Sequence, residues 1–230
     1  MMARDKVLSA NNKAPFAVVE AYKNIRIRLV YTLEQINGKV VAFSSPNVAE
    51  GKSTTAVNMA ITLSQLNKKV ILVDGDIRRS TVHKKLKIEN NKGLSNILER
   101  SCSFEDAVIN YNEYLDVLTS GDSTANPSDL VGSSDFDNLM QKLREEYDYV
   151  IIDTPPIDIV SDTLVIAQKC DGIILIARIS VTTYSELRSA SASLEALNIN
   201  VLGTIFNAAG SAKKRYGSYY KYGSYNKYGY

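Results

Sequence analysis

A short segment near residue 50 has the residue types of a phosphate-binding loop. The segment SSPNVAEGKSTT (44–55) contains Gly51, Lys52 and Ser53, which match the last part of the G-x-x-x-x-G-K-[ST] pattern. In such a loop backbone N–H groups point at phosphates, the lysine contacts the β- and γ-phosphates, and the hydroxyl ligates Mg²⁺. Pro46 stands at the place of the first glycine and has no N–H to donate. Because an apolar run precedes the loop and a helical pattern follows it, nucleotide binding is favoured over a chance Gly-Lys-Ser turn.

Three aspartates at the ends of apolar runs could complete a site for phosphoryl transfer. Asp74 and Asp76 follow VILV, and Asp153 follows VII. Ligand sites of open α/β sheets lie beyond the carboxyl ends of the strands, and a phosphoryl-transfer site needs acidic residues to hold Mg²⁺. A single aspartate there is commonly a turn or capping residue, but three of them with the GKST loop favour a metal–nucleotide site. Arg78 and Arg79 come next, and their side chains could meet phosphates or pair with acids.

The elements that must position these residues alternate along the chain. Continuously apolar runs, typical of strands buried on both faces, are found at 39–43, 69–74, 149–153, 172–177 and 199–206, with a weaker run at 114–121. Helical patterns cover 15–35, 53–66, 134–147 and 183–197. This alternation predicts an α/β fold, with a mainly parallel sheet flanked by helices on both faces. We expect a mobile arm (1–14), one folded domain (15–209) and a flexible tail (210–230).

The C-terminal segment RYGSYYKYGSYNKYGY holds half of the chain's 14 tyrosines and no acidic residue. Its glycines and serines raise the entropy lost on ordering, so we expect it to be exposed, with phenol hydroxyls that accept phosphoryl groups. The candidates are Tyr216, Tyr219, Tyr220, Tyr222, Tyr225, Tyr228 and Tyr230. A sticky low-complexity end, a nucleic-acid tether with stacking rings, or a terminus without a role are the alternatives.

Composition excludes several other classes of protein. The 230 residues fit one sizeable domain, and the net charge of +2 does not point to any partner. Cys102 and Cys170 lack metal-ligand spacing and are interpreted as reduced thiols of a cytosolic protein, and His83, the single histidine, cannot build a histidine-based metal site. No run approaches 18 apolar residues, and the first residues lack the apolar core of a signal peptide, so we predict neither a membrane span nor export.

Taken together, GKSTT, DGDIRR and DTPP resemble the motifs of the deviant-Walker P-loop ATPases. More narrowly, the chain resembles the bacterial tyrosine kinases (BY-kinases) of capsule and exopolysaccharide synthesis. Further similarities are the NPSDL segment (126–130), the terminal tyrosines, and the spacing of Glu20, Lys23 and Arg26, which is similar to the E-x-x-R-x-x-R that the family uses to form rings. Two residues depart from the family pattern: Ala49 replaces a loop glycine, and Lys23 replaces an arginine.

The resemblance implies a role for each residue of the site. Lys52 would contact the β- and γ-phosphates of ATP, Ser53 and Asp76 would hold Mg²⁺, and Asp153 would bind Mg²⁺ through water. Asp74 would orient or deprotonate the incoming tyrosine. The residues implied to bind the nucleotide are Ala49, Glu50, Gly51, Lys52, Ser53, Thr54 and, at the adenine, Asn207.

The resemblance also implies an activity and partners. The protein would be an ATP-dependent protein-tyrosine kinase that phosphorylates its own C-terminal cluster in trans and regulates polysaccharide synthesis and export. Its partners would be a transmembrane activator of the chain-length regulator type, further copies of itself in a ring, and a tyrosine phosphatase, with no nucleic acid. It would be cytoplasmic and recruited to the inner face of the membrane. A nucleotide-switch ATPase like MinD or ParA, without kinase activity, is the alternative.

Overall fold

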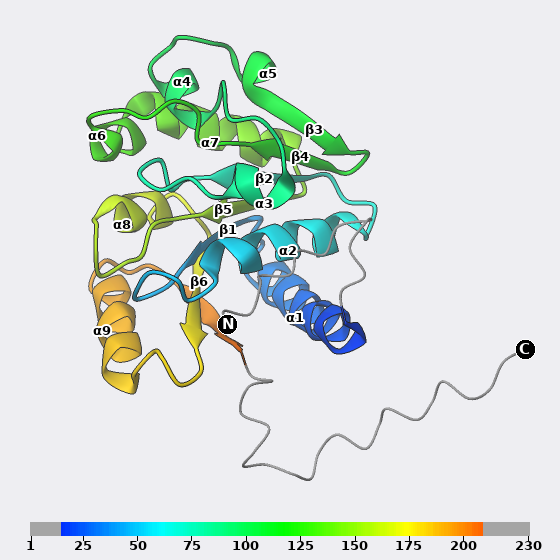
Figure 1. Ribbon diagram of the computed structural model, residues 1–230, viewed down its shortest axis with the longest axis vertical. Coiled ribbons are helices and arrows are strands. Elements are labelled where there is room, and N and C mark those ends of the chain that lie inside the picture. The colour runs from blue at the N-terminus through cyan, green and yellow to red at the C-terminus, as the bar shows by residue number, and fades with distance from the viewer. Residues whose placement is uncertain (1–14, 209–230) are drawn as a thin grey trace, which may run out of the picture.

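The computed structural model describes residues 15–208, which form a seven-stranded sheet with helices on both faces (Figure 1). The strands are β1 (Val40–Ser44), β2 (Val70–Asp74), β3 (Val108–Asn112), β4 (Leu115–Leu118), β5 (Tyr149–Asp153), β6 (Gly172–Arg178) and β7 (Val201–Asn207). The helices are α1 (Phe16–Gln35), α2 (Lys52–Ser64), α3 (Val82–Leu86), α4 (Leu94–Leu98), α5 (Phe104–Ala107), α6 (Pro127–Val131), α7 (Ser134–Glu146), α8 (Asp162–Ala167) and α9 (Tyr184–Glu195).

The strands follow the order β3-β4-β2-β5-β1-β6-β7, and every neighbouring pair except β3 and β4 is parallel. The predicted α/β class and mainly parallel sheet are therefore confirmed, and each of the six apolar runs forms a strand. The antiparallel edge strand β3 was not predicted. Its sequence VINYN is only partly buried and contains two asparagines, so it lacks the continuous apolar character of a strand covered on both faces.

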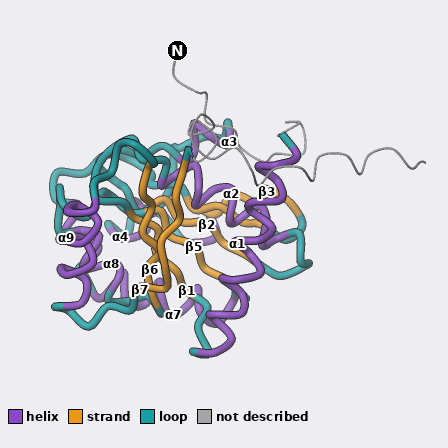
Figure 2. Tube along the Cα trace, turned by 90° about the horizontal axis from the view of Figure 1, so that it is seen from below, coloured by secondary structure: helices purple, strands orange, loops and turns teal. Residues whose placement is uncertain are grey.

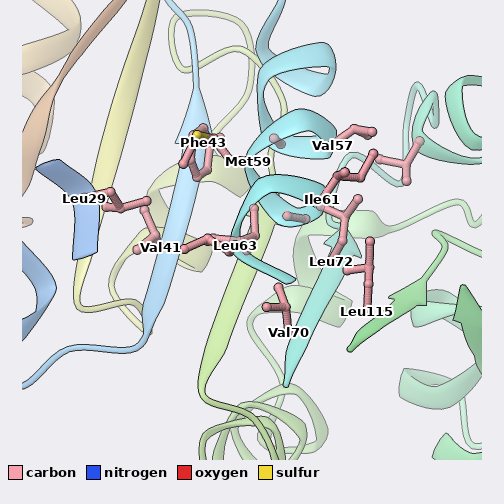
Figure 3. Close-up of a cluster of buried hydrophobic side chains, with 14 of the residues drawn as sticks. Leu29, Val41, Phe43, Val57, Met59, Ile61, Leu63, Val70, Leu72 and Leu115 are labelled. Carbon is pink, nitrogen blue, oxygen red and sulfur yellow. The ribbon is translucent and has the colours of Figure 1, made fainter. Parts of the chain in front are cut away.

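Side chains of each central strand enter two different cores, because successive residues of a strand point to opposite faces. Val41 and Phe43 of β1 belong to the core under α1 and α2, whereas Val40 and Ala42 pack on the opposite side, with α7, α8 and α9. Figure 2 shows the sheet between its helices, and Figure 3 shows the first core. There Leu29 of α1 joins the side chains of α2 and of the strands.

The four predicted helices are α1, α2, α7 and α9, with ends within two residues of the predicted ones. Helices α7 and α9, on the face of the sheet opposite α1 and α2, begin at side-chain caps. Ser133 Oγ accepts from Phe136 N, and Thr183 forms a capping box with Glu186. The remaining helices have four to six residues, which is too short for a helical hydrophobic period to be read from sequence.

The arm (1–14) and the tail (210–230) lie outside the described residues, so the division of the chain into arm, domain and tail stays a prediction. Within residues 15–208, no helix is both long enough and apolar enough to cross a membrane.

Candidate active site

The candidate catalytic residues meet where the three central strands end. β5 lies between β2 and β1, and all three run in the same direction. Asp74 at the end of β2 is the register partner of Asp153 at the end of β5. The phosphate loop follows β1 and leads directly into α2, whose first residue is Lys52. The parallel sheet therefore brings the loop and the aspartates to one edge, as the sequence suggested.

Lys52 lies between two of the aspartates. Its Nζ is 2.9 Å from Asp76 Oδ2, 3.4 Å from Asp153 Oδ1 and 3.3 Å from Ser53 Oγ. Burial by itself disfavours the ammonium, but the charges of Asp153, Asp76 and Asp74 outweigh it and raise the pKa of Lys52 above its ordinary value. The lysine is therefore charged and is held at the edge of the sheet by two carboxylates.

Asp74 is fully buried and is anchored through one oxygen only. Its Oδ2 accepts hydrogen bonds from Ser80 Oγ (2.9 Å) and from the backbone N–H groups of Thr81 (3.2 Å) and Val82 (3.1 Å). Its Oδ1 is buried and has no hydrogen-bond partner among the described residues. Burial, helped by the charge of Asp153, raises the pKa of Asp74 to about 7.

Asp153 shares this environment. Burial raises its pKa, although the Lys52 ammonium opposes the rise. Its Oδ2 is a second buried carboxylate oxygen for which residues 15–208 provide no partner. Two uncompensated buried oxygens side by side are costly, and a cation or a proton-donating ligand would satisfy them.

These residues fit a Mg²⁺–nucleotide complex. Within the described part of the chain, no group of three or more histidine, cysteine or acidic side chains is arranged to hold a metal ion alone. Mg²⁺ in nucleotide sites is usually bound through one or two carboxylates, often with a hydroxyl of the phosphate loop, and completes its shell with phosphate oxygens and water. The Ser53 hydroxyl, Asp76 and the free oxygen of Asp153 match that requirement.

The phosphate loop adopts a conformation that favours glycine at two positions. Gly51 has φ +99°, and a Cβ there would lie 2.5 Å from Asn207 Nδ2. Ala49, which replaces the family's glycine, has φ +63°. The left-handed conformation is thus kept without the glycine, at a strain of roughly 1–2 kcal/mol. Arg178 Nη1 donates to Ala49 O at 3.0 Å and helps to hold the strained residue.

Hydrogen bonds from Glu50 and from residues outside the phosphate loop also hold the loop in place. The buried Glu50 carboxylate accepts the backbone N–H of Asn47 at 2.9 Å through Oε2 and the Thr182 hydroxyl through Oε1. Asn207 Nδ2 donates to Glu50 O at 3.0 Å and to Thr55 Oγ1 at 3.1 Å. Thr182 could not be predicted from the sequence, because it lies in the connection after β6 and belongs to no motif.

Other residues of the DGDIRR segment shape the site without entering it. A Cβ on Gly75 would lie 2.9 Å from Asp153 O, so the two strand ends approach closely only because this residue is glycine. Arg78 pairs with the buried Asp162, with Nε 2.7 Å from Oδ2, and also donates to Ser128 Oγ at 2.9 Å. Of the two interpretations of Arg78, pairing with an acid is therefore the one observed. Ser128 belongs to the NPSDL segment (126–130), so this segment helps to hold the Arg78 side chain beside Asp162.

Comparisons with known proteins agree with this arrangement. A family model described as an AAA domain matches residues 38–186. Tyrosine-protein kinase YwqD of Bacillus subtilis (strain 168) is 37% identical over 202 residues, which cover 87% of this chain and 85% of that protein. Putative tyrosine-protein kinase CapB of Staphylococcus aureus is 32% identical over 93% of this chain and 94% of its own.

The chain belongs to the bacterial tyrosine kinases. Among solved structures, the kinase domain of Escherichia coli tyrosine kinase ETK superimposes with a TM-score of 0.85 at 28% identity, covering 100% of this chain and 88% of that one. The resemblance to BY-kinases within the P-loop ATPases is confirmed, and with it the enzyme class, a protein-tyrosine kinase. The family is one of nucleotide-binding proteins.

The residues that resemble the ring motif of these bacterial tyrosine kinases make contacts within one chain. Lys23 Nζ pairs with Glu20 Oε1 at 2.8 Å on the surface of α1, and Arg26 Nη1 donates to Thr62 O of α2 at 2.8 Å. Ring formation through these residues stays a prediction. The tail tyrosines lie outside the described residues: Tyr216, Tyr219, Tyr220, Tyr222, Tyr225, Tyr228 and Tyr230.

Proposed function

We propose that this bacterial tyrosine kinase uses Mg²⁺–ATP to phosphorylate the tyrosines of its own C-terminal segment, each subunit acting on a neighbour. The observation that best supports the site assignment is the position of Lys52 Nζ, between Asp76 and Asp153 and at the first residue of the helix that follows the phosphate loop. A bound nucleotide would offer the lysine phosphate oxygens in place of these carboxylates, and the carboxylates would then be free to hold Mg²⁺.

Each group of the site then has a task. Lys52 would contact the β- and γ-phosphates, and the backbone N–H groups of Ala49, Glu50, Gly51, Lys52, Ser53 and Thr54 would surround the phosphates. Ser53 and Asp76 would hold Mg²⁺ directly, and Asp153 would hold it through water. Such a metal would supply charge neutralisation at the phosphates. Asn207 already uses Nδ2 within the protein, so Oδ1 is the atom that would accept from the adenine amino group.

Asp74 orients or deprotonates the tyrosine hydroxyl. Its pKa of about 7 suits a general base at neutral pH, since the carboxylate is partly ionised and still basic. The support for this role is that Oδ1 is buried without a partner in the described chain, while Oδ2 is held by three donors. One oxygen is therefore available for a substrate proton.

Phosphorylation of the tail would change the charge of the molecule. Each phosphate adds about −1.5 to −2 charges, so seven would add about −10 to −14 to a chain that carries +2. The phosphorylated tail would be repelled by the acidic site and by other tails. We propose that this loosens a ring held by Glu20, Lys23 and Arg26, and that a tyrosine phosphatase resets it.

The cellular setting follows from the same resemblance. We propose that the protein regulates capsular or exopolysaccharide synthesis and export, that it acts in the cytoplasm, and that a transmembrane activator of the chain-length regulator type recruits it to the membrane. No nucleic-acid partner is proposed.

A mixing experiment tests the kinase function. Full-length Lys52→Met protein is incubated with an active, tail-deleted protein, the cytoplasmic part of the activator and Mg²⁺–ATP, and phosphates are located by mass spectrometry. We expect phosphotyrosine on the tail of the inactive protein. A Lys68→Met protein, which changes an exposed lysine beyond α2, serves as the matched control and should phosphorylate its tail normally. An unmodified tail on the inactive protein excludes transfer between subunits. Release of ADP with no phosphotyrosine in any mixture would make the chain a nucleotide switch like MinD or ParA.

A further inference from the structure

The only histidine of the chain is connected to the candidate base by one hydroxyl group. His83 lies on α3, with its Nδ1 2.8 Å from Ser80 Oγ, and Ser80 Oγ is 2.9 Å from Asp74 Oδ2. From the sequence, His83 could be judged only as a possible metal ligand. Its neighbours in space connect it to the catalytic edge of the sheet.

The directions of these two hydrogen bonds follow from counting protons. When Asp74 is ionised, its Oδ2 can only accept, so the single Ser80 hydroxyl proton points to Asp74. The Ser80 oxygen must then accept from His83, which requires a proton on Nδ1. When Asp74 is ionised and His83 carries its proton on Nδ1, the Ser80 hydroxyl therefore accepts from His83 and donates to Asp74, and this fixes its orientation.

This coupling fixes the orientation of the Asp74 carboxylate. The two other donors to Oδ2 are the backbone N–H groups of Thr81 and Val82, which remain when Ser80 or His83 is substituted. Ser80 supplies the third, and a hydroxyl rotates freely unless a second partner fixes it. With three donors on one oxygen, the plane of the carboxylate is held, and the other oxygen, Oδ1, keeps its position without a partner in the described protein.

We propose that His83 is a positioning residue for phosphoryl transfer to tyrosine, which orients the Ser80 hydroxyl and thereby holds Asp74 with Oδ1 available to the substrate hydroxyl. The inference rests on the proposed role of Asp74. His83 does not touch the substrate, so its effect passes through Ser80 and is confined to the transfer step, whereas the nucleotide is bound by the loop before α2.

Two amide substitutions separate positioning from packing. Asparagine places an N–H donor near the position of Nδ1, whereas glutamine places it near Nε2. We expect His83→Asn to keep most of the activity and His83→Gln to lower kcat for tail phosphorylation about tenfold at pH 8, because it releases the Ser80 hydroxyl from its hydrogen bond to the charged Asp74. KM for ATP should change less than twofold in both. Lys87→Gln, at the exposed residue that caps the C-terminal end of the same helix, is the matched control and should retain wild-type kcat.

A double-mutant cycle tests the route. Ser80→Ala should lower kcat about tenfold, and adding His83→Gln to it should cause no further loss, because the histidine has no hydroxyl left to orient. Equal kcat values for the asparagine and glutamine variants, or additive losses in the double mutant, would overturn the proposal. Asp74→Asn measured in parallel separates the two hypotheses. If it remains active, the proposed role of Asp74 fails. If it is inactive while His83→Gln is normal, only the role of His83 fails.

Discussion

Replacing Asp74 with asparagine provides a test of both stability and chemistry. Burial and the nearby Asp153 raise the pKa of Asp74 from its usual 3.8 to about 7. Because one pKa unit corresponds to about 1.4 kcal/mol, keeping this carboxylate ionised destabilises the fold by about 4 kcal/mol above pH 7. Asparagine keeps an oxygen for the three donors that hold Oδ2, but its amino group needs a partner, at a cost of about 1–3 kcal/mol. We expect a net gain of about 1–3 kcal/mol in unfolding free energy.

The gain should depend on pH in a defined direction. The folded state binds the Asp74 proton more tightly than the unfolded state, so the stability contributed by this group falls as pH rises from about 4 to about 7. The asparagine variant lacks this loss. The variant should therefore be less stable than the wild type near pH 4, where only the cost of its amino group remains, and its advantage should be largest at pH 8, where it corresponds to about 3–10 °C in Tm.

The assay is thermal unfolding of nucleotide-free protein in a chelating buffer at pH 5 and pH 8, with tail phosphorylation measured on the same samples. Asp129→Asn, which changes an exposed carboxylate on α6, is the control and should alter stability by less than about 0.5 kcal/mol at either pH. The Asp74 variant should be more stable and inactive. If the Asp74→Asn protein is less stable than the wild type at pH 8, or if its gain does not vary with pH, burial of the Asp74 charge does not destabilise the fold as argued.

Three further substitutions test the surroundings of the site. Ala49→Gly removes the strain of a φ of +63° and should raise the unfolding free energy by about 1 kcal/mol and tighten ATP binding, as measured by denaturation and nucleotide titration. Gly75→Ala brings a Cβ to 2.9 Å from Asp153 O and should destabilise by about 1–3 kcal/mol, with most phosphoryl transfer lost. Arg78→Ala leaves the buried Asp162 without its cation, which now holds the pKa of that carboxyl below its usual value. Stability should fall at neutral pH and recover relative to wild type as the pH is lowered and Asp162 becomes protonated in the variant, as followed by urea unfolding.

Strand and helix positions were largely readable from the sequence because the central strands are buried on both faces. A continuously apolar run such as VILVD is typical of a strand buried on both faces, and the six predicted runs form β1, β2, β4, β5, β6 and β7. The half-exposed β3 and the five shortest helices carry no such period, so they could not be predicted.

The candidate site was readable in its residue types but not in its connections. GKST and the three aspartates predicted a site for phosphoryl transfer, because buried carboxylates at the ends of apolar strands are costly unless a cation or another partner compensates their charge. Nothing in the order of residues connects Thr182 to Glu50, which are 132 positions apart, or His83 to a carboxylate. Such pairs exist only once the sheet has brought distant loops together.

The sequence by itself therefore determined the class of fold and predicted the candidate nucleotide loop with its set of acidic groups, since each depends on local pattern and on spacing within a short segment. The tertiary structure alone decided that one buried oxygen of Asp74 has no partner in the described chain, that Lys52 lies beside Asp76, and that Arg78 pairs with Asp162. The physical reason is that hydrogen bonding and desolvation depend on distances of a few ångströms between atoms far apart in the chain, and these distances are defined only by the packed sheet.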